Sequence, residues 1–306
     1  MRFSSTDLRR SVRAALGPAV IDTLHWFVNR RDWYGAQDLG RKIGAWGYRH
    51  DARHRDIILH NLSLAYGDAL TEQAAHDIAK GCLQNVTMLF IEALRLADMS
   101  REECLEICDI KGEQHLQAAL ELGRGVVMFT GHLGNQEVGA VRLIHGGYNV
   151  LPLSRPPRSP RIGRKFKQIR ARQNFPVIPV SEGLKGIFRA LKSNCIVPVM
   201  PDRYAKGQGV VVPFFGLKTN VWHTPALLYS RTQSPVLPTH ALRRPDGRFV
   251  IEVDPPVEMK VSEDRDADLV ENTARLMAVL EQKVRAVPEQ YAWQYRLWRG
   301  DPERAD

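Results

Sequence analysis

One stretch of the chain, residues 125–137 with the sequence GVVMFTGHLGNQE, limits the possible folds more than any other. Its apolar run at 126–129 is continuous, which is typical of a strand covered on both faces, and a threonine and a glycine end the run. From Asn135 the apolar residues follow helical spacing until two glycines at 146–147. This order of strand, turn and helix predicts an α/β sheet, and such sheets bind ligands at the carboxyl ends of their strands.

The remaining pattern predicts a helical N-terminal region followed by an α/β core. Residues 71–97 keep helical apolar spacing, and Ser100 with Glu103 forms a capping box that opens a short helix. Predicted strands cover 108–111, 125–130, 148–153, 176–180, 195–200, 235–241 and 247–253. Predicted helices cover 113–122, 135–145, 160–173, 183–192, 224–233 and 267–286. We therefore predict an α/β fold whose largely parallel sheet carries an antiparallel hairpin, with a helical region, 1–107, packed on one continuous catalytic core domain, 108–306.

A histidine stands in the turn after the strand at 125–130. Gly131 and Gly134 flank His132 and would let the backbone approach a ligand closely, and Glu137 would lie in the first turn of the following helix. A carboxylate bonded to one ring nitrogen leaves the other nitrogen free to take a proton. The pattern therefore predicts a catalytic base with an orienting acid. A histidine that only fills or caps the turn remains an alternative, because about one His-x4-acid match is expected by chance.

Two further stretches would add groups to the same crevice. Asp202 and Arg203 directly follow the predicted strand at 195–200, so they would meet His132 at the carboxyl edge of the sheet. Phe214 and Phe215 would form either an apolar wall for an amphipathic substrate or part of the core. Thr224 is the predicted N-cap of the helix at 224–233.

Charge and composition narrow the classes of partner. The net charge of +9 indicates anionic partners, and the run at 155–172 carries only positive charges, as a clamp for phosphate groups would. No run without a charged residue exceeds 12 residues, whereas a membrane-spanning helix needs about 20, so we expect no transmembrane segment. The basic N-terminus is either a segment that lies on a membrane surface or an ordinary first helix. The four cysteines lack zinc-ligand spacing, so we expect no metal site.

Taken together, these motifs resemble the bacterial lipid A biosynthesis acyltransferase family, which adds secondary acyl chains. The resemblance extends from about residue 33 to 298. The blocks that carry it are HNLSLAYGD at 60–68, IEALRL at 91–96, FTGHLGNQE at 129–137, SRP at 154–156, MPDR at 200–203, VPFFG at 212–216 and PEQYAWQYRLW at 288–298. The family fold is similar to that of glycerol-phosphate acyltransferases, an α/β sandwich.

The resemblance implies an enzyme that moves a fatty acyl group from a thioester to a hydroxyl of a phosphorylated glycolipid in lipid A or lipopolysaccharide biosynthesis. The donor would be acyl carrier protein or coenzyme A, with no cofactor and no metal. His132 and Glu137 would be catalytic. Residues expected to bind substrate are Gly131, Gly134, Asn135, Arg155, Asp202, Arg203, Phe214 and Phe215. The expected location is the cytoplasmic face of the bacterial inner membrane, peripheral, or partly the cytosol.

Two residues depart from the family pattern. Gln136 stands where tryptophan is common and Arg203 where glutamine is common. A different acceptor, such as a mannoside, another glycolipid or a lipid amine, therefore remains an alternative. A non-catalytic basic protein on an anionic membrane or nucleic acid is a second alternative. Nucleic acid is disfavoured, because the basic run at 155–172 offers only Phe166 for stacking on a base. Amides near 131–134, or Arg155, would stabilise the oxyanion.

Overall fold

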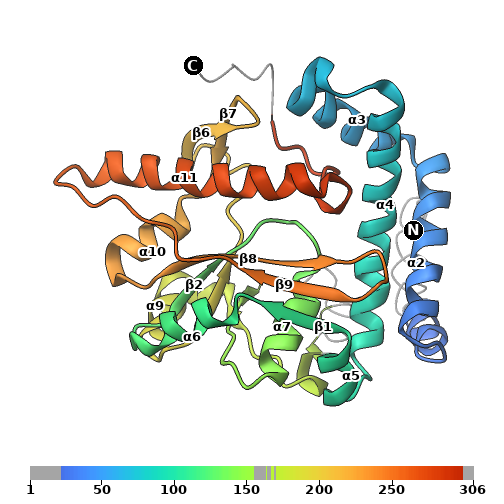
Figure 1. Ribbon diagram of the computed structural model, residues 1–306, viewed down its shortest axis with the longest axis horizontal. Coiled ribbons are helices and arrows are strands. Elements are labelled where there is room, and N and C mark those ends of the chain that lie inside the picture. Colours follow the sequence, from blue (N-terminus) through green and yellow to red (C-terminus); the bar gives the residue numbers. More distant parts are fainter. Residues whose placement is uncertain (1–21, 155–162, 164–166, 169, 299–306) are drawn as a thin grey trace, which may run out of the picture.

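A five-stranded mixed sheet forms the centre of the protein (Figure 1). The computed structural model describes residues 22–154, 163, 167–168 and 170–298. The strands lie in the order β1-β9-β8-β2-β5, and each neighbouring pair is parallel except β8 with β9. Their bounds are β1 Cys108–Lys111, β2 Val126–Phe129, β5 Ile196–Val199, β8 Val236–Arg243 and β9 Phe249–Val253. The predicted α/β class and the antiparallel β8–β9 hairpin are confirmed.

Two short pairs of strands lie outside this sheet. One pair is parallel, β3 Leu153–Ser154 with β4 Ile178–Pro179. The other is an antiparallel hairpin, β6 Val210–Phe214 with β7 Leu217–Val221. The sequence analysis did not predict this hairpin.

Helices cover both faces of the sheet. Their bounds are α2 Trp33–His50, α3 Ala52–Tyr66, α4 Glu72–Leu96, α5 Arg101–Glu106, α6 Glu113–Glu121, α7 Gln136–His145, α9 Gly183–Lys192, α10 Thr224–Thr232 and α11 Arg265–Ala286, with short 3-10 helices η1 Gly67–Ala69, η2 Val180–Glu182 and η3 Pro288–Gln290. The capping box of Ser100 and Glu103 is confirmed at α5. His223, not Thr224, is the N-cap of α10. Half of the predicted helix at 160–173 lies outside the described residues.

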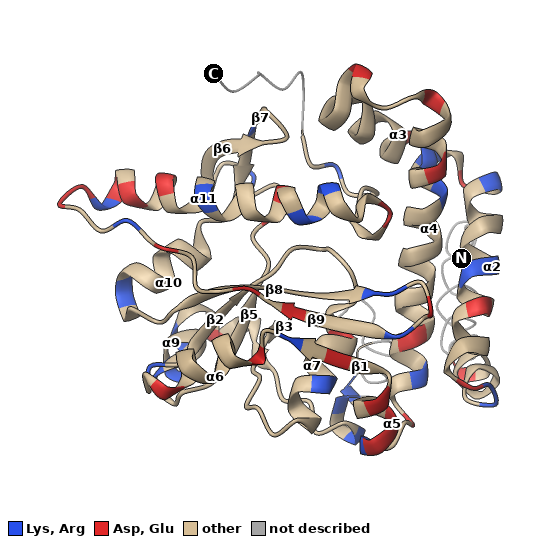
Figure 2. Ribbon diagram, in the orientation of Figure 1, with Lys and Arg blue, Asp and Glu red and all other residues tan. Residues whose placement is uncertain are grey.

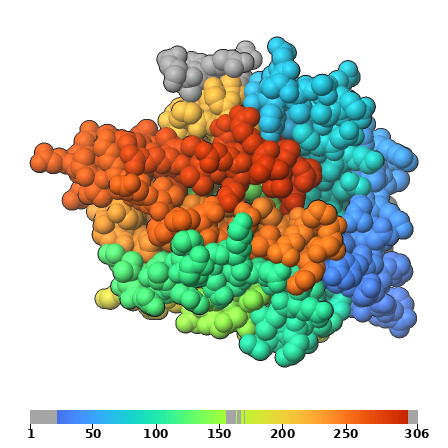
Figure 3. Space-filling view, viewed as in Figure 1, coloured from blue at the N-terminus to red at the C-terminus, as the bar shows by residue number. Residues whose placement is uncertain are grey.

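The apolar run of β2 is buried on both sides, as predicted. Val127 and Phe129 pack into a core cluster with residues of α9, α10 and α11. Val126 and Met128 face a second cluster with residues of α6 and α7. Successive side chains of a strand point to opposite faces, so a central strand needs apolar residues at every position. Figure 3 shows α11 lying across one face of the molecule.

The helices before β1 pack on the core through α4, with α2 beside it (Figure 1). Gly40 and Gly44 of α2 lie against the backbone of α4. A Cβ on Gly44 would stand 2.4 Å from the Cα of Gln84. Only glycine permits two helix backbones to approach this closely. The division of the chain at residue 107 stays a prediction.

A glycine pair in α2 tests this contact. Gly44→Ala should destabilise the protein by about 1–3 kcal/mol, because its methyl group overlaps the α4 backbone. Gly47→Ala is the matched control: a Cβ there meets nothing within 4 Å, so this variant should gain about 0.5–1 kcal/mol from helix propensity. Chemical denaturation of both variants measures the difference. Equal stabilities would show that α2 does not pack on α4 in this way.

Candidate active site

His132 and Asp202 meet at the carboxyl edge of the sheet. His132 follows β2 and Asp202 follows β5, and these strands are parallel neighbours, so both strands end at the same edge. The Nδ1 of His132 lies 2.7 Å from Oδ1 of Asp202, and the backbone N–H of His132 donates to Oδ2 at 2.7 Å. Two residues separated by 69 others along the chain thus form a two-point contact.

Asp202 is a buried carboxylate that its neighbours keep ionised. Its side chain is 1% exposed, and the hydroxyl of Tyr291 donates to Oδ2 at 3.1 Å. Burial acts to raise the pKa of Asp202, but the charge and hydrogen bonds of His132 and the Tyr291 hydroxyl lower it overall. Because the folded pKa is lowered, this carboxylate stabilises the fold above the pKa of an unfolded aspartate. That contribution is lost as the pH falls through the folded value.

The hydrogen bond to Asp202 fixes the proton on Nδ1 of His132 and leaves Nε2 as an acceptor. No described residue bonds Nε2, and the side chain of His132 is 21% exposed. The ring stands edge-on to Tyr295, with centroids 5.5 Å apart. Nε2 can therefore take a proton from a bound molecule.

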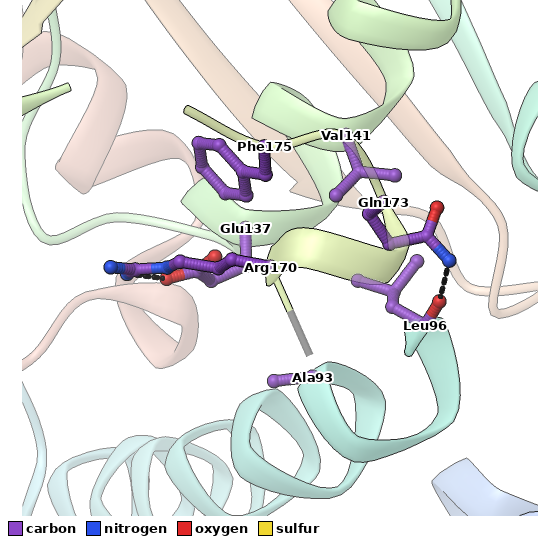
Figure 4. Close-up of a pocket in the computed structure, with 7 residues that line it drawn as sticks. All are labelled: Ala93, Leu96, Glu137, Val141, Arg170, Gln173 and Phe175. Atoms are coloured by element: carbon purple, nitrogen blue, oxygen red, sulfur yellow. Dashed lines mark hydrogen bonds and ion pairs between the residues drawn. The ribbon is translucent and has the colours of Figure 1, made fainter. Parts of the chain in front are cut away.

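The expectation that Glu137 orients His132 is wrong. Oε1 of Glu137 accepts a hydrogen bond from Arg170 at 2.8 Å, and Arg170 also donates to Ser154 at 2.7 Å. Figure 4 shows this pair beside Phe175, in a pocket between α4 and α7. The pocket holds about 20 Å³, enough for one water molecule but not for a substrate. A catalytic role for Glu137 by other means stays a prediction.

Hydrogen bonds of its main chain hold the loop that carries His132. They occupy amides that were expected to stabilise the oxyanion. The amides of His132, Gly134 and Asn135 already donate to Asp202, Gln290 and Ala241 respectively. These three amides are therefore not free to stabilise an oxyanion.

The side chain of Gln136 adds to this support. Its amide donates to the carbonyls of Gly131 and Leu133, both at 2.8 Å. The departure from the family pattern at this position thus braces the turn from within.

The two glycines of the loop lie against neighbouring elements, and the expectation that they let a ligand approach stays a prediction. A Cβ on Gly131 would lie 2.6 Å from a methyl group of Leu280 on α11. Gly134 has φ +71, and a Cβ there would lie 2.0 Å from the carbonyl oxygen of Ala241 on β8. Gly134 thus excludes larger residues because the β8 backbone presses on it, whereas a Cβ at Gly131 would require the methyl groups of Leu280 to shift.

A buried polar network that sequence analysis missed ties the loop to the helical region. Glu92 on α4 is fully buried and accepts two hydrogen bonds from Arg243 on β8, at 2.9 and 2.7 Å. It also accepts from Gln37 of α2 and from Asn135, each at 2.7 Å. Asn135 in turn caps α7 through its side-chain oxygen. The signal was an acid inside the apolar block IEALRL, where a buried charge needs partners.

The other predicted substrate-binding residues divide into three cases. Phe214 and Phe215 are 1% and 4% exposed and pack with Tyr291, Trp293 and Trp298, so they belong to the core and form no wall facing a substrate. Arg203 is exposed beside the site. Arg155 lies outside the described residues.

The four cysteines are buried free thiols. Burial raises the pKa of Cys82, Cys104 and Cys108 to about 12, which leaves these thiols poor nucleophiles at neutral pH. Within the described ranges, no three potential metal ligands of the His, Cys, Asp and Glu types lie together.

A carboxylate-held imidazole with a free nitrogen, at the carboxyl edge of a mixed α/β sheet, is the arrangement of an enzyme that uses a histidine base. A profile of the bacterial lipid A biosynthesis acyltransferase family matches residues 34–300. The chain belongs to this family.

Individual relatives have two kinds of name. The chain is 29% identical over 177 residues to a phosphatidylinositol mannoside acyltransferase of Mycolicibacterium smegmatis, covering 56% of this chain and 58% of that protein. It is 32% identical over 157 residues to the protein of that name from Mycobacterium tuberculosis, covering 49% of each. It is 25% identical over 283 residues to the lipid A biosynthesis lauroyltransferase of Escherichia coli, covering 91% and 90%. The chain thus spans about half the length of the mannoside acyltransferases it matches.

Isosteric substitutions separate the roles of the two acids. Asp202→Asn should lower kcat by about 10²–10⁴-fold, because the imidazole loses the acceptor that fixes its tautomer and stabilises its charged form. Glu137→Gln keeps a polar side chain beside Arg170 and should cost less. Steady-state acyl transfer, with near-UV circular dichroism to verify folding, measures both. A loss in Glu137→Gln equal to or above that of Asp202→Asn would refute the assignment of Asp202.

Proposed function

We propose that this protein transfers a fatty acyl group from an acyl thioester to a hydroxyl of a phosphorylated glycolipid. The donor is acyl carrier protein or coenzyme A, and no metal or cofactor takes part. The observation that carries this proposal is the free Nε2 of His132, opposite an Nδ1 that Asp202 holds at 2.7 Å. The overall architecture fits the α/β sandwich that the resemblance to glycerol-phosphate acyltransferases implies.

His132 and Asp202 together support direct transfer of the acyl group from the thioester to the acceptor hydroxyl. Nε2 of His132 takes the proton of the acceptor hydroxyl as its oxygen attacks the thioester carbonyl, and the imidazolium that forms is stabilised by Asp202. When the tetrahedral intermediate collapses, the carbon–sulfur bond breaks and the new ester remains. The imidazolium then returns its proton to the departing thiolate. One histidine thus serves as both base and acid. The thiol and the ester are released, and the enzyme returns to its starting state.

The relatives point to two classes of acceptor. A phosphorylated glycolipid of the lipid A type fits the relative that matches over nearly the whole chain. A mannoside fits the relatives that are more similar over a shorter stretch, at 29% and 32% identity. Both acceptors present a sugar hydroxyl to the same base, so one mechanism serves either.

Helix α2 suits attachment to the surface of an anionic membrane. In the described part of the chain, no helix is both long and apolar enough to span a bilayer. The outer side of α2 exposes Trp46 (63%) and Ile43 (39%), and Lys and Arg residues lie along the same helix (Figure 2). Aromatic side chains among cations are typical of a membrane interface. We infer a peripheral protein at the cytoplasmic face of the inner membrane.

Vesicle sedimentation tests the membrane surface. Trp46→Gln should weaken binding to vesicles that contain anionic phospholipid, because an exposed aromatic anchor is removed. Val261→Gln is the control: Val261 is 68% exposed and lies in the segment before α11, outside α2. Equal binding by Trp46→Gln and the wild type would exclude α2 as the attachment surface.

The proposed reaction depends on His132. His132→Ala should remove nearly all acyl transfer and leave the fold intact, because the ring is partly exposed and its loop is held by main-chain bonds. Purified protein, a radiolabelled acyl thioester and candidate glycolipid acceptors provide the assay. A folded His132→Ala protein with wild-type turnover would disprove the mechanism. Transfer by the wild type to lipid A precursors or to mannosides identifies the acceptor.

A further inference from the structure

An arginine, a tyrosine and the candidate base contact one another in series, Arg203 on Tyr295 and Tyr295 on His132. The guanidinium carbon of Arg203 lies 4.1 Å from the centre of the Tyr295 ring, and that ring contacts His132 edge-on. The backbone of Tyr295 is fixed, because its carbonyl accepts a hydrogen bond of 2.7 Å from Asn61, which is 2% exposed. The arginine is therefore placed one aromatic ring away from the imidazole.

Stacking leaves the hydrogen-bonding edge of this arginine available. A guanidinium contacts an aromatic ring through its flat face, so its N–H groups still point outward in the plane. Arg203 is exposed, and none of the described residues accepts a hydrogen bond or forms an ion pair with it. Arg285 provides a contrast, since it lies over Phe215 but is also paired with Glu281.

We propose that Arg203, supported by Tyr295, binds a phosphate group of a co-substrate beside His132. This inference rests on the proposed acyl transfer and names the chemistry that places a substrate there. Two parallel N–H donors of Arg203 match two phosphate oxygens. The neighbouring carboxylate of Asp202 cannot compete with the phosphate for Arg203, because it is buried and bonded to His132 and Tyr291. The phosphate belongs either to the acceptor glycolipid or to the pantetheine arm of the donor.

Substrate truncation distinguishes these two sources. Arg203→Gln and Arg203→Lys are assayed with an acyl-coenzyme A or the phosphate-free acyl-pantetheine as donor, and with a glycolipid acceptor before or after removal of its phosphate. Lys206→Gln is the matched control, because it removes an exposed cation from the same loop. Near-UV circular dichroism verifies that each variant is folded.

The expected result is a loss that depends on the phosphate. Arg203→Gln should lower kcat/KM by about 10- to 100-fold with the phosphorylated form of one substrate, mainly through KM, and leave turnover of its phosphate-free form unchanged. Arg203→Lys should fall between, since lysine keeps the charge but not the fork. Lys206→Gln should match the wild type. The substrate whose truncation removes the effect carries the phosphate that Arg203 binds.

Two results would overturn the proposal: unchanged kinetics of Arg203→Gln with every substrate pair, or an equal loss with both phosphate-free substrates. Calorimetric titration with inorganic pyrophosphate provides a readout that needs no turnover. The wild type should bind pyrophosphate at least about tenfold more tightly than Arg203→Gln. Equal binding would refute the anion site. A wild type that binds pyrophosphate through Arg203 but transfers no acyl group would instead refute the proposed function.

Discussion

The site depends on a single buried carboxylate. Asp202 is almost fully enclosed, so its charge requires hydrogen-bond donors, and three reach it: the ring and backbone N–H groups of His132 and the hydroxyl of Tyr291. This requirement fixes the histidine at two points, which positions the loop as well as the ring. Gly131 packs beside this contact, where a Cβ would lie 2.6 Å from a methyl group of Leu280 and 3.2 Å from Oδ2 of Asp202.

Contacts from outside the central sheet also hold the loop that carries His132. Its backbone pairs with the C-terminal segment at Leu133 and Tyr291, and its last residue, Asn135, is bonded to Glu92 on α4. Glu92 is itself neutralised by Arg243 of β8, so the helical region and the sheet contact the loop through one buried ion pair. The helices before β1 are thus part of the support of the candidate base, which a division of the chain at residue 107 does not reveal.

The sequence predicted local features better than contacts across the fold. The strand β2, the helix α7 and the hairpin of β8 and β9 follow from apolar spacing and turn residues, so they could be predicted within a few residues. Nearness in sequence favours Glu137 as the partner of His132, whereas Asp202 follows a different strand, β5. Periodicity does not give strand order, so no local pattern shows that β2 and β5 are neighbours. The predicted strands do not include the β6–β7 hairpin, whose residues Phe214 and Phe215 suit either an apolar wall or the core by sequence and lie in the core.

Glu137, the acid of the His-x4-Glu pattern, pairs with an arginine and not with His132. Glu137 lies in the first turn of α7, where the helix dipole favours a negative charge, and it binds Arg170 from the end of the basic run. Arg170 also bonds Ser154, the residue before that run, so Ser154, Arg170 and Glu137 are linked beside the helix that follows His132. The motif therefore joins two contacts on one strand–turn–helix unit: His132 with Asp202 in the turn, and Glu137 with Arg170 in the first turn of α7. The five-residue spacing reflects the separation of these two contacts along one strand–turn–helix unit, not a contact between the histidine and the glutamate.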